Sequence, residues 1–564
     1  MQITATTTTG RGKSGSASRP DLYFLPALLF ITVGALLIRL YVGSREFMDF
    51  DEWQQVFIAS VPRWIDLKYE LRNEAHPPVF YILLKALLAF GSGKLWYRCL
   101  AIVPGAASVF LVGMIGRKVF RFSSVALLCA GAMALSTAAI TISIEVRQYQ
   151  LATFFILVAF LSFLSILRSQ ARPRLLYFAT FSAASALAVG CHYFAFLFLV
   201  PCLLVSLFFE FRSCQSLAVC GRKVTPRRTL GLTLSFTLPL CAFVYFYLKY
   251  IQNFNLHGHP GEEFYWRLAV NETWRTFLLR NFQNFMNLFS PVQFQSQLVL
   301  LLVLAVLGIG SIFIFLKSRR EERTKYRYRA IPAAFVAIIV LELMTLSLAG
   351  KYPFGGLVRH QYIAGPFLLL ATFSVVDDAL SLLISGLRVV LLTVVALLMA
   401  SHLIVAWPGI IVYPDGPKLY SWAFDHYQSS FPQAQAVYVD HWGVIGYYMN
   451  TDNRKRRFVR GITGVAFIDQ YRVGRPSGGI DIFYDKSRYN LDLSDPMLYN
   501  SFATCLTESG IKELTLFFLT PGDVPIADPN GLRSTIIERA ADGGLSATKV
   551  VIDHTAVYAG FILK

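Results

Sequence analysis

Three short motifs carry the residue types that could do chemistry. They are Asp51-Glu52, the run from His76-Pro77-Pro78 through Tyr81 to Lys85, and Glu145-Val146-Arg147. Charged side chains close to lipid are costly and are most often functional. Carboxylates can act as general bases or metal ligands, whereas Lys and Arg can neutralise a phosphate. In this order, the three motifs indicate an enzyme that works on a lipid-linked substrate.

The composition indicates the class of protein to which these motifs belong. Of the 564 residues, 55% are hydrophobic and 15% are charged, and the mean hydropathy is +0.51. Repeated apolar runs of about 20 residues indicate a polytopic helical membrane protein. The net charge of +18 does not indicate nucleic-acid binding, because the basic residues cluster in short loops between apolar runs. The eight cysteines form no CxxC pair, so we expect neither a zinc site nor a disulfide framework.

Hydropathy predicts about eleven transmembrane helices, with a transmembrane domain over residues 21–407 that follows a disordered cytoplasmic N-terminus, residues 1–20. The spans are placed at 21–42, 99–116, 123–144, 149–167, 174–191, 193–210, 230–250, 297–316, 331–349, 362–382 and 387–407. With the N-terminus inside, the basic loops near 117–121, 168–174, 212–228 and 317–329 all become cytoplasmic.

The opposite loops then carry the unusual residues. Segment 77–92 is apolar but short for a span, so we expect a helix in the outer interface with Lys85 facing the headgroups. The aromatic, mixed-charge loop 251–296 is also consistent with interfacial helices. Both loops therefore place their charged side chains at the outer boundary of the membrane.

The composition changes after residue 413, where we expect a soluble α/β domain over residues 413–564 on the outer face. Buried strands are predicted at 436–440, 480–484 and 514–519, a helix at 534–541, and paired strands within 548–563. The complete fold prediction is an all-α polytopic membrane protein with interfacial helices and a C-terminal α/β domain.

The motifs resemble those of the GT-C glycosyltransferases that use polyprenyl-phosphate sugars. The most similar branch contains protein O-mannosyltransferases, lipid A aminoarabinose transferases and rhizobial lipopolysaccharide galacturonosyltransferases. The resemblance rests on Phe50-Asp-Glu-Trp53, His76-Pro-Pro-Val-Phe-Tyr-Ile-Leu-Leu-Lys85, Gly116-Arg-Lys-Val-Phe120 and Glu145-Val-Arg-Gln-Tyr149. It implies a GT-C fold, a polyprenyl-phosphate sugar donor, and a lipid, glycan or protein acceptor.

The resemblance gives Asp51 the role of the base that takes a proton from the acceptor hydroxyl, with inversion at the anomeric carbon. The alternative for Asp51 is a cap of an interfacial helix. Glu52 is either an orienting partner or a solvated neighbour. Both residues, with Glu145, form the predicted catalytic set.

The departing lipid phosphate needs positive charge or a metal. Lys85 is similar to the family's phosphate-binding lysine, and Tyr81 shares its helix face one turn earlier. The alternative for Lys85 is snorkelling to the headgroups. Arg147, His76 and Arg359 are further candidate phosphate ligands. His76 could instead have a structural role at the start of the helix. Arg359 stands in an Arg-His-Gln-Tyr sequence, which departs from the family's Arg-Tyr pattern.

Glu145 resembles the family's second acidic position. Asp51 and Glu145 could hold Mg²⁺ or Mn²⁺ with waters completing the shell. The alternative is an ion pair of Glu145 with Arg147 or Lys85. The cofactor prediction is therefore either a divalent cation or, if Glu145 forms an ion pair instead, no cofactor.

Three other functions compete with the glycosyltransferase hypothesis. A flippase of lipid-linked sugars predicts charged residues in mid-span and repeated halves, which the sequence does not show. A polymerase acting on lipid-pyrophosphate oligosaccharides also needs outward-facing charge, and a structural scaffold does not need the charged set. We expect a multi-pass protein of the bacterial inner membrane, with a cytoplasmic N-terminus and an extracytoplasmic C-terminal domain.

Overall fold

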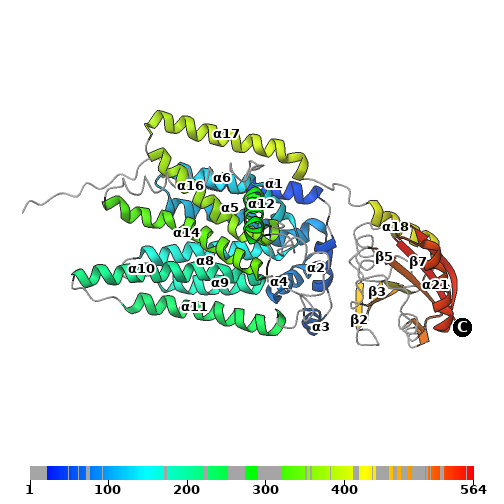
Figure 1. Ribbon diagram of the computed structural model, residues 1–564. Coiled ribbons are helices and arrows are strands. Elements are labelled where there is room, and N and C mark those ends of the chain that lie inside the picture. Colours follow the sequence, from blue (N-terminus) through cyan, green and yellow to red (C-terminus); the bar gives the residue numbers. More distant parts are fainter. Residues whose placement is uncertain are drawn as a thin grey trace, which may run out of the picture.

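A computed structural model gives the fold of the chain. It describes residues 22–46, 48, 50–60, 63–71, 76–91, 93–169, 174–220, 226–251, 273–289, 320–349, 352, 354–355, 358–381, 383–410, 418–432, 434, 436–439, 456–460, 466–471, 480–485, 502–503, 506–507, 510–520, 526–553 and 556–564. The helices of the N-terminal part run side by side along one axis, and a smaller sheet domain lies beyond one end of them (Figure 1).

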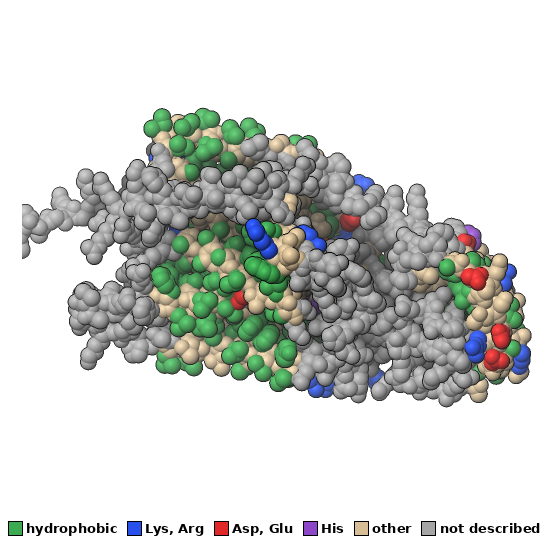
Figure 2. All heavy atoms as spheres, viewed as in Figure 1, with side chains coloured by type: hydrophobic (Ala, Val, Ile, Leu, Met, Phe, Trp, Pro, Cys, Tyr) green, Lys and Arg blue, Asp and Glu red, His purple; other side chains and the backbone are tan. Residues whose placement is uncertain are grey.

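The helical part contains long apolar helices together with several short helical segments. They are α1 (Phe24–Arg45), α5 (Lys94–Val119), α6 (Ser123–Leu135), α7 (Thr137–Ile144), α8 (Gln148–Arg168), α9 (Leu175–Cys191), η3 (Tyr193–Phe198), α10 (Leu199–Cys220), α11 (Pro226–Phe246), η4 (Tyr247–Ile251), α14 (Arg320–Leu348), α15 (Val358–Gln361), η7 (Tyr362–Ala364), α16 (Gly365–Ser381) and α17 (Ser385–Ile410). Hydrophobic side chains cover the flank of this bundle (Figure 2). The chain is a multi-pass membrane protein.

Within the described ranges, 6 helices are long and apolar enough to cross a membrane, or 7 if α6 and α7 form one bent span. Every predicted span coincides with helical structure except 297–316, which lies outside the described residues. The predicted span 123–144 differs in shape, because α6 and α7 meet at an angle of 54°. Ser136 separates them and accepts a hydrogen bond from the backbone N–H of Ala139, which caps the start of α7.

Three short helices lie at the end of the bundle that faces the sheet domain (Figure 1). They are α2 (Phe50–Ser60), α3 (Trp64–Glu70) and α4 (Pro78–Leu88). A helix rises about 1.5 Å per residue, so the 11 residues of α4 cannot cross a hydrocarbon layer of about 30 Å. This agrees with the interfacial helix expected at 77–92. Helix α12 (Trp274–Phe289) lies within the loop 251–296.

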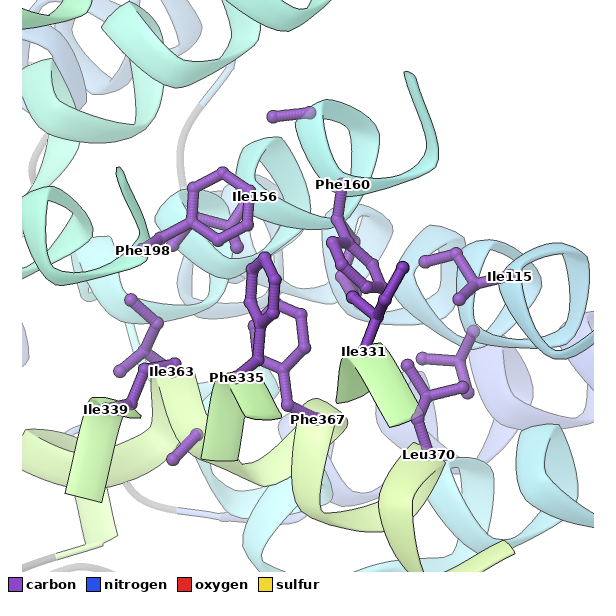
Figure 3. Close-up of a cluster of buried hydrophobic side chains, with 14 of the residues drawn as sticks. Ile115, Ile156, Phe160, Phe198, Ile331, Phe335, Ile339, Ile363, Phe367 and Leu370 are labelled. Atoms are coloured by element: carbon purple, nitrogen blue, oxygen red, sulfur yellow. The ribbon is translucent and has the colours of Figure 1, made fainter. Parts of the chain in front are cut away.

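Phenylalanine rings from distant segments form the centre of the bundle (Figure 3). Phe160 of α8 has its ring centroid 4.8 Å from that of Phe335 and 5.0 Å from that of Phe367. Phe198 lies 5.8 Å from Phe335. These edge-on and tilted ring contacts hold α8, α14 and α16 together at the centre of the bundle.

The C-terminal domain is a 7-stranded sheet with the order β2-β3-β4-β1-β5-β7-β6. Its elements are α18 (Lys418–Ser430), β1 (Ala436–Val439), β2 (Arg456–Arg460), β3 (Ala466–Tyr471), β4 (Ile480–Asp485), β5 (Glu513–Leu519), α21 (Pro529–Asp542), β6 (Leu545–Asp553) and β7 (Ala556–Leu563). Strand β1 is parallel to both β4 and β5, and the other pairs are antiparallel.

Alternate residues of the central strands face opposite helices. Val437 packs in one cluster with Phe424 of α18, whereas Tyr438 packs in another cluster with Ile536 of α21. This period of two buries the central strands on both faces. It confirms the expected α/β domain, while the boundaries 21–407 and 413–564 stay predictions.

An ion cluster stabilises the opposite, basic ends of the helices. Asp377 is fully buried and accepts hydrogen bonds from the backbone N–H groups of Arg121, at 2.9 Å, and of Phe122, at 3.0 Å. Arg329 donates to Asp378 at 2.8 Å and lies 3.6 Å from Asp377. Asp377 therefore joins α16 to the start of α6 and to α14.

We expect Asp377→Asn to lower the free energy of unfolding by about 1–3 kcal/mol, because an amide group cannot accept all these hydrogen bonds and leaves buried donors unpaired. Thermal unfolding can be followed by labelling buried Cys129, Cys191 and Cys202 with a thiol-reactive dye. The exposed Asp542→Asn variant is the control. An unchanged midpoint for Asp377→Asn would show that this cluster does not stabilise the bundle.

Candidate active site

Asp51 lies in the first turn of α2 and meets two arginines from distant segments. The guanidinium of Arg147, which directly precedes α8, donates to Asp51 Oδ2, and Arg359 Nη1 of α15 donates to the same oxygen at 2.6 Å. The Asp51 side chain keeps 31% of its surface exposed. A carboxylate in the first helical turn is also favoured by the helix dipole. Asp51 is thus fixed in place yet still accessible.

The arginines determine the charge of Asp51. Burial raises the pKa of the carboxyl, but Arg147 and Arg359 outweigh burial, so the pKa lies below its ordinary value of 3.8. Asp51 is therefore ionised at neutral pH.

Glu52 points in another direction and is buried, with 2% of its side chain exposed. Arg98 of α5 donates to both its oxygens, from Nε at 3.0 Å and from Nη2 at 2.6 Å, and the backbone N–H of Val146 donates to Oε1 at 2.8 Å. Arg98 also donates to the carbonyl of Gly43 at 2.7 Å. Glu52 is therefore not a solvated neighbour, and its contacts tie α1, α2, α5 and the turn before α8 together.

Aromatic and imidazole rings lie beside Asp51. The ring centroid of His192 is 4.9 Å from that of Tyr149 and 5.5 Å from that of His76. The backbone N–H of Phe194 donates to His192 Nδ1 at 3.1 Å, so a neutral His192 carries its proton on Nε2. Burial lowers the pKa of His192 to about 3, and burial and the neighbouring His192 hold the pKa of His76 well below 6.5. Both imidazoles are neutral at pH 7.

A small pocket opens next to this group. Its lining combines rings, small apolar side chains and one cation: Tyr149, Ala152, Thr153, Ile156, His192, Phe194, Ala195, Arg359, Tyr362 and Ile363. Ile156 and Ile363 belong to the apolar centre of the bundle (Figure 3). The pocket therefore runs from Arg359 toward the interior of the bundle.

Several buried polar groups near the pocket have no hydrogen-bond partner in the described part of the chain. The Tyr362 hydroxyl is one, and the side-chain amides of Gln148 and Gln361 are two more, although both glutamines are completely buried. Buried polar groups are nearly always paired, so such atoms need a ligand or water as an explanation. This part of the molecule is therefore suited to a polar ligand.

The other predicted site residues lie farther along the same end of the protein. The Lys85 ammonium lies over the ring of Trp64, 5.4 Å from its centroid, and the Lys85 side chain is half-buried. Tyr81 is completely buried in the apolar cluster that contains α4. Glu145 is half-buried and directly follows α7. The structure thus brings Asp51, Arg147, Arg359 and His76 into one group, and the phosphate-binding roles of Lys85 and Tyr81 stay predictions.

The predicted metal site does not fit the residues around Asp51. Among the described residues, no group of three or more His, Cys, Asp or Glu side chains is arranged to hold a metal ion. In addition, two guanidinium groups already contact Asp51 Oδ2, so a cation bound there with Glu145 would have to displace them.

The sequence analysis missed Arg98 and Tyr362. Arg98 stands directly before a predicted span, and a charged residue at that position is itself a signal of a buried partner. Tyr362 was noted only as part of the Arg-His-Gln-Tyr pattern. No sequence signal shows that its hydroxyl lines the same pocket as His192.

No family model and no curated protein matches the sequence. The fold is similar to ArnT from Cupriavidus metallidurans in the apo state, with 12% identity, a TM-score of 0.55, and coverage of 95% of this chain and 98% of that one. It is also similar to ArnT bound to undecaprenyl phosphate, with 12% identity, a TM-score of 0.51, and coverage of 94% and 97%. These likenesses confirm the expected GT-C fold with its C-terminal domain.

The Glu52–Arg98 pair gives a stability prediction. Glu52→Gln should lower the free energy of unfolding by about 3–5 kcal/mol, because it leaves the buried Arg98 charge uncompensated. Arg98→Met removes that charge, so the double variant should be more stable than the sum of the two single losses predicts. Thermal unfolding of all four proteins tests this, and simple additivity would show that the two residues do not interact.

Proposed function

We propose that this protein is an integral membrane glycosyltransferase that moves a sugar from a polyprenyl-phosphate donor to a hydroxyl of a lipid, glycan or protein acceptor. The observation that carries the proposal is the accessible carboxylate of Asp51, held by Arg147 and Arg359 beside a pocket. The shared fold supports it, since one ArnT structure is described as bound to undecaprenyl phosphate.

The helix ends support an extracytoplasmic site. Helix α5 has Arg98 in its first turns, near the site, and Arg117 and Lys118 in its last turn. Helix α8 likewise begins after Arg147 and ends at Arg168. The site and the basic loops therefore lie at opposite ends of the same helices. Since basic loops are retained on the cytoplasmic side, the site belongs to the outer face, which in a bacterium is that of the inner membrane.

The proposed reaction is a direct displacement. The acceptor oxygen attacks the anomeric carbon while its proton passes to Asp51, and the bond from that carbon to the phosphate oxygen breaks. Polyprenyl phosphate leaves with the bonding electrons, and the anomeric configuration inverts. Arg147 and Arg359 would neutralise the departing phosphate.

The shared arginines connect donor binding to the strength of the base. In the free protein, both guanidinium groups hold the pKa of Asp51 down, which makes it a weak proton acceptor. A bound phosphate would compete for the same guanidinium groups. Asp51 would then lose its stabilising partners, and burial would raise its pKa. The base would therefore become effective only when the leaving group is in place.

Asp51→Asn should abolish sugar transfer, because an amide cannot accept the acceptor proton. The measurement is transfer in liposomes that contain a panel of polyprenyl-phosphate sugars and envelope lipids, with the exposed Glu538→Gln variant as the control. Normal transfer by a folded Asp51→Asn protein would refute the role of Asp51. Lipid movement across the bilayer without transfer would favour a flippase, and processive products would favour a polymerase.

The pH dependence of kcat/KM should show no ionisation of Asp51, His76 or His192 between about pH 5 and 8. Because the pKa of the Asp51 carboxyl is lowered, Asp51 is charged at every pH above its ordinary pKa. It becomes neutral only when the pH falls through the lowered pKa. An acid limb near pH 6.5 that disappears in His76→Gln would contradict this assignment.

A further inference from the structure

The break between α6 and α7 is bridged by one buried cation. Arg39 of α1 is completely buried. On the α6 side of the break, its Nη2 donates to the carbonyl of Met133 at 3.4 Å and its Nη1 to that of Ala134 at 3.3 Å. On the α7 side, its Nε donates to Ser143 Oγ at 3.1 Å. One guanidinium group therefore contacts both arms of the bend.

The position of Arg39 has a physical cause. The last carbonyls of a helix lack intrahelical partners and carry partial negative charge. The break at Ser136 creates such an end inside the bundle, where water is absent. A charged side chain in a membrane interior is costly unless its donors are satisfied. The carbonyls at the end of α6 and the guanidinium group of Arg39 thus satisfy each other.

The contact continues to the neighbouring helices. Ser143 Oγ lies 3.1 Å from Gln150 Oε1 of α8, and Gln150 Nε2 donates to Ser108 Oγ of α5 at 3.0 Å. Space is also restricted there. A Cβ atom on Gly105 would lie 2.5 Å from Ser143 Oγ and 3.2 Å from Arg39 Nε. The residues at the bend therefore pack closely against α5 at Gly105.

The residues after α7 belong to the candidate active site. Helix α7 has 8 residues and ends at Ile144, followed by Glu145. Val146 then donates its backbone N–H to Glu52, and Arg147 contacts Asp51. A change in the direction of α7 would move these residues together.

We infer that Arg39 is a positioning residue, which fixes the bend between α6 and α7 and thereby sets the place where Arg147 meets Asp51. Its effect on transfer rests on the proposed function. Arg39 is not among the residues that line the pocket, although it interacts electrostatically with Tyr362, which is. Its effect on Arg147 passes through α7.

The test compares Arg39→Lys with the wild type in lipid nanodiscs. Lysine keeps the charge, but its single nitrogen cannot reach both arms of the bend. Hydrogen–deuterium exchange should rise in residues 137–150 and stay unchanged in the C-terminal domain. The kcat per folded molecule should fall about ten- to hundredfold, as expected for a small misplacement of reacting groups. Arg45→Lys, at the exposed end of the same helix, is the matched control.

A second variant covers the case in which Arg39→Lys does not fold. Ser143→Ala removes the contacts of Ser143 with Arg39 and Gln150 without disturbing the charge, and it should raise exchange in the same segment by a smaller amount. Unchanged exchange and unchanged kcat in a folded variant would overturn the inference. Exchange that rises uniformly over the bundle, with normal kcat, would show a merely structural role and would also overturn it. Local loosening without any transfer by the wild type would support the positioning contact and refute only the proposed reaction.

Discussion

Two adjacent carboxylates at the start of α2 are neutralised by residues from three other segments. Asp51 pairs with Arg147 and Arg359, while Glu52 pairs with Arg98 and receives the N–H of Val146. A buried charge without its partner costs several kcal/mol, on the order of 3–5. The start of α5, the turn before α8, and α15 therefore have to converge on α2, and Arg98 also holds the end of α1 there. This convergence brings chemically useful groups together.

In a lipid environment, charged and polar contacts decide which helix ends meet more than apolar burial does. Lipid tails are as apolar as the helix surfaces, so burial against a neighbouring helix gives little preference for one arrangement. The phenylalanine core provides close packing at the centre of the bundle, but hydrogen bonds and ion pairs specify which ends meet. The Asp377 cluster does this at the basic end, and the Asp51–Glu52 group does it at the other.

The sequence predicted the features that depend on local composition. Hydropathy located the spans because each one is a long apolar run. The buried strands of the C-terminal domain were predicted because each one is a short apolar run. Strands β2 and β3 were missed because they contain Arg456, Arg457 and Asp469 rather than a continuous apolar run. The bend at Ser136 was missed because residues on both sides of it are equally apolar.

The site could be predicted only in part. Asp51, Arg147 and Arg359 were found because they stand in loops or at span ends that the sequence places on one side of the membrane, and because the motifs around them resemble a known family. Their common contact involves residues 308 positions apart in the sequence, and no local pattern reports such a distance. The arrangement of Lys85 over Trp64 is similarly invisible, because it depends on the angle between α3 and α4.

The short helix α4 also affects the lipid around the protein. Its 11 residues span about 16 Å, roughly half the hydrocarbon thickness. Phe90 and Trp96 near its end are exposed, as is Ile82 on its surface. A helix of this length that lies along the interface presents these apolar side chains to the ends of the lipid tails. A lipid carrier whose chain packs against α4 would then hold its headgroup beside α2, the helix that carries Asp51.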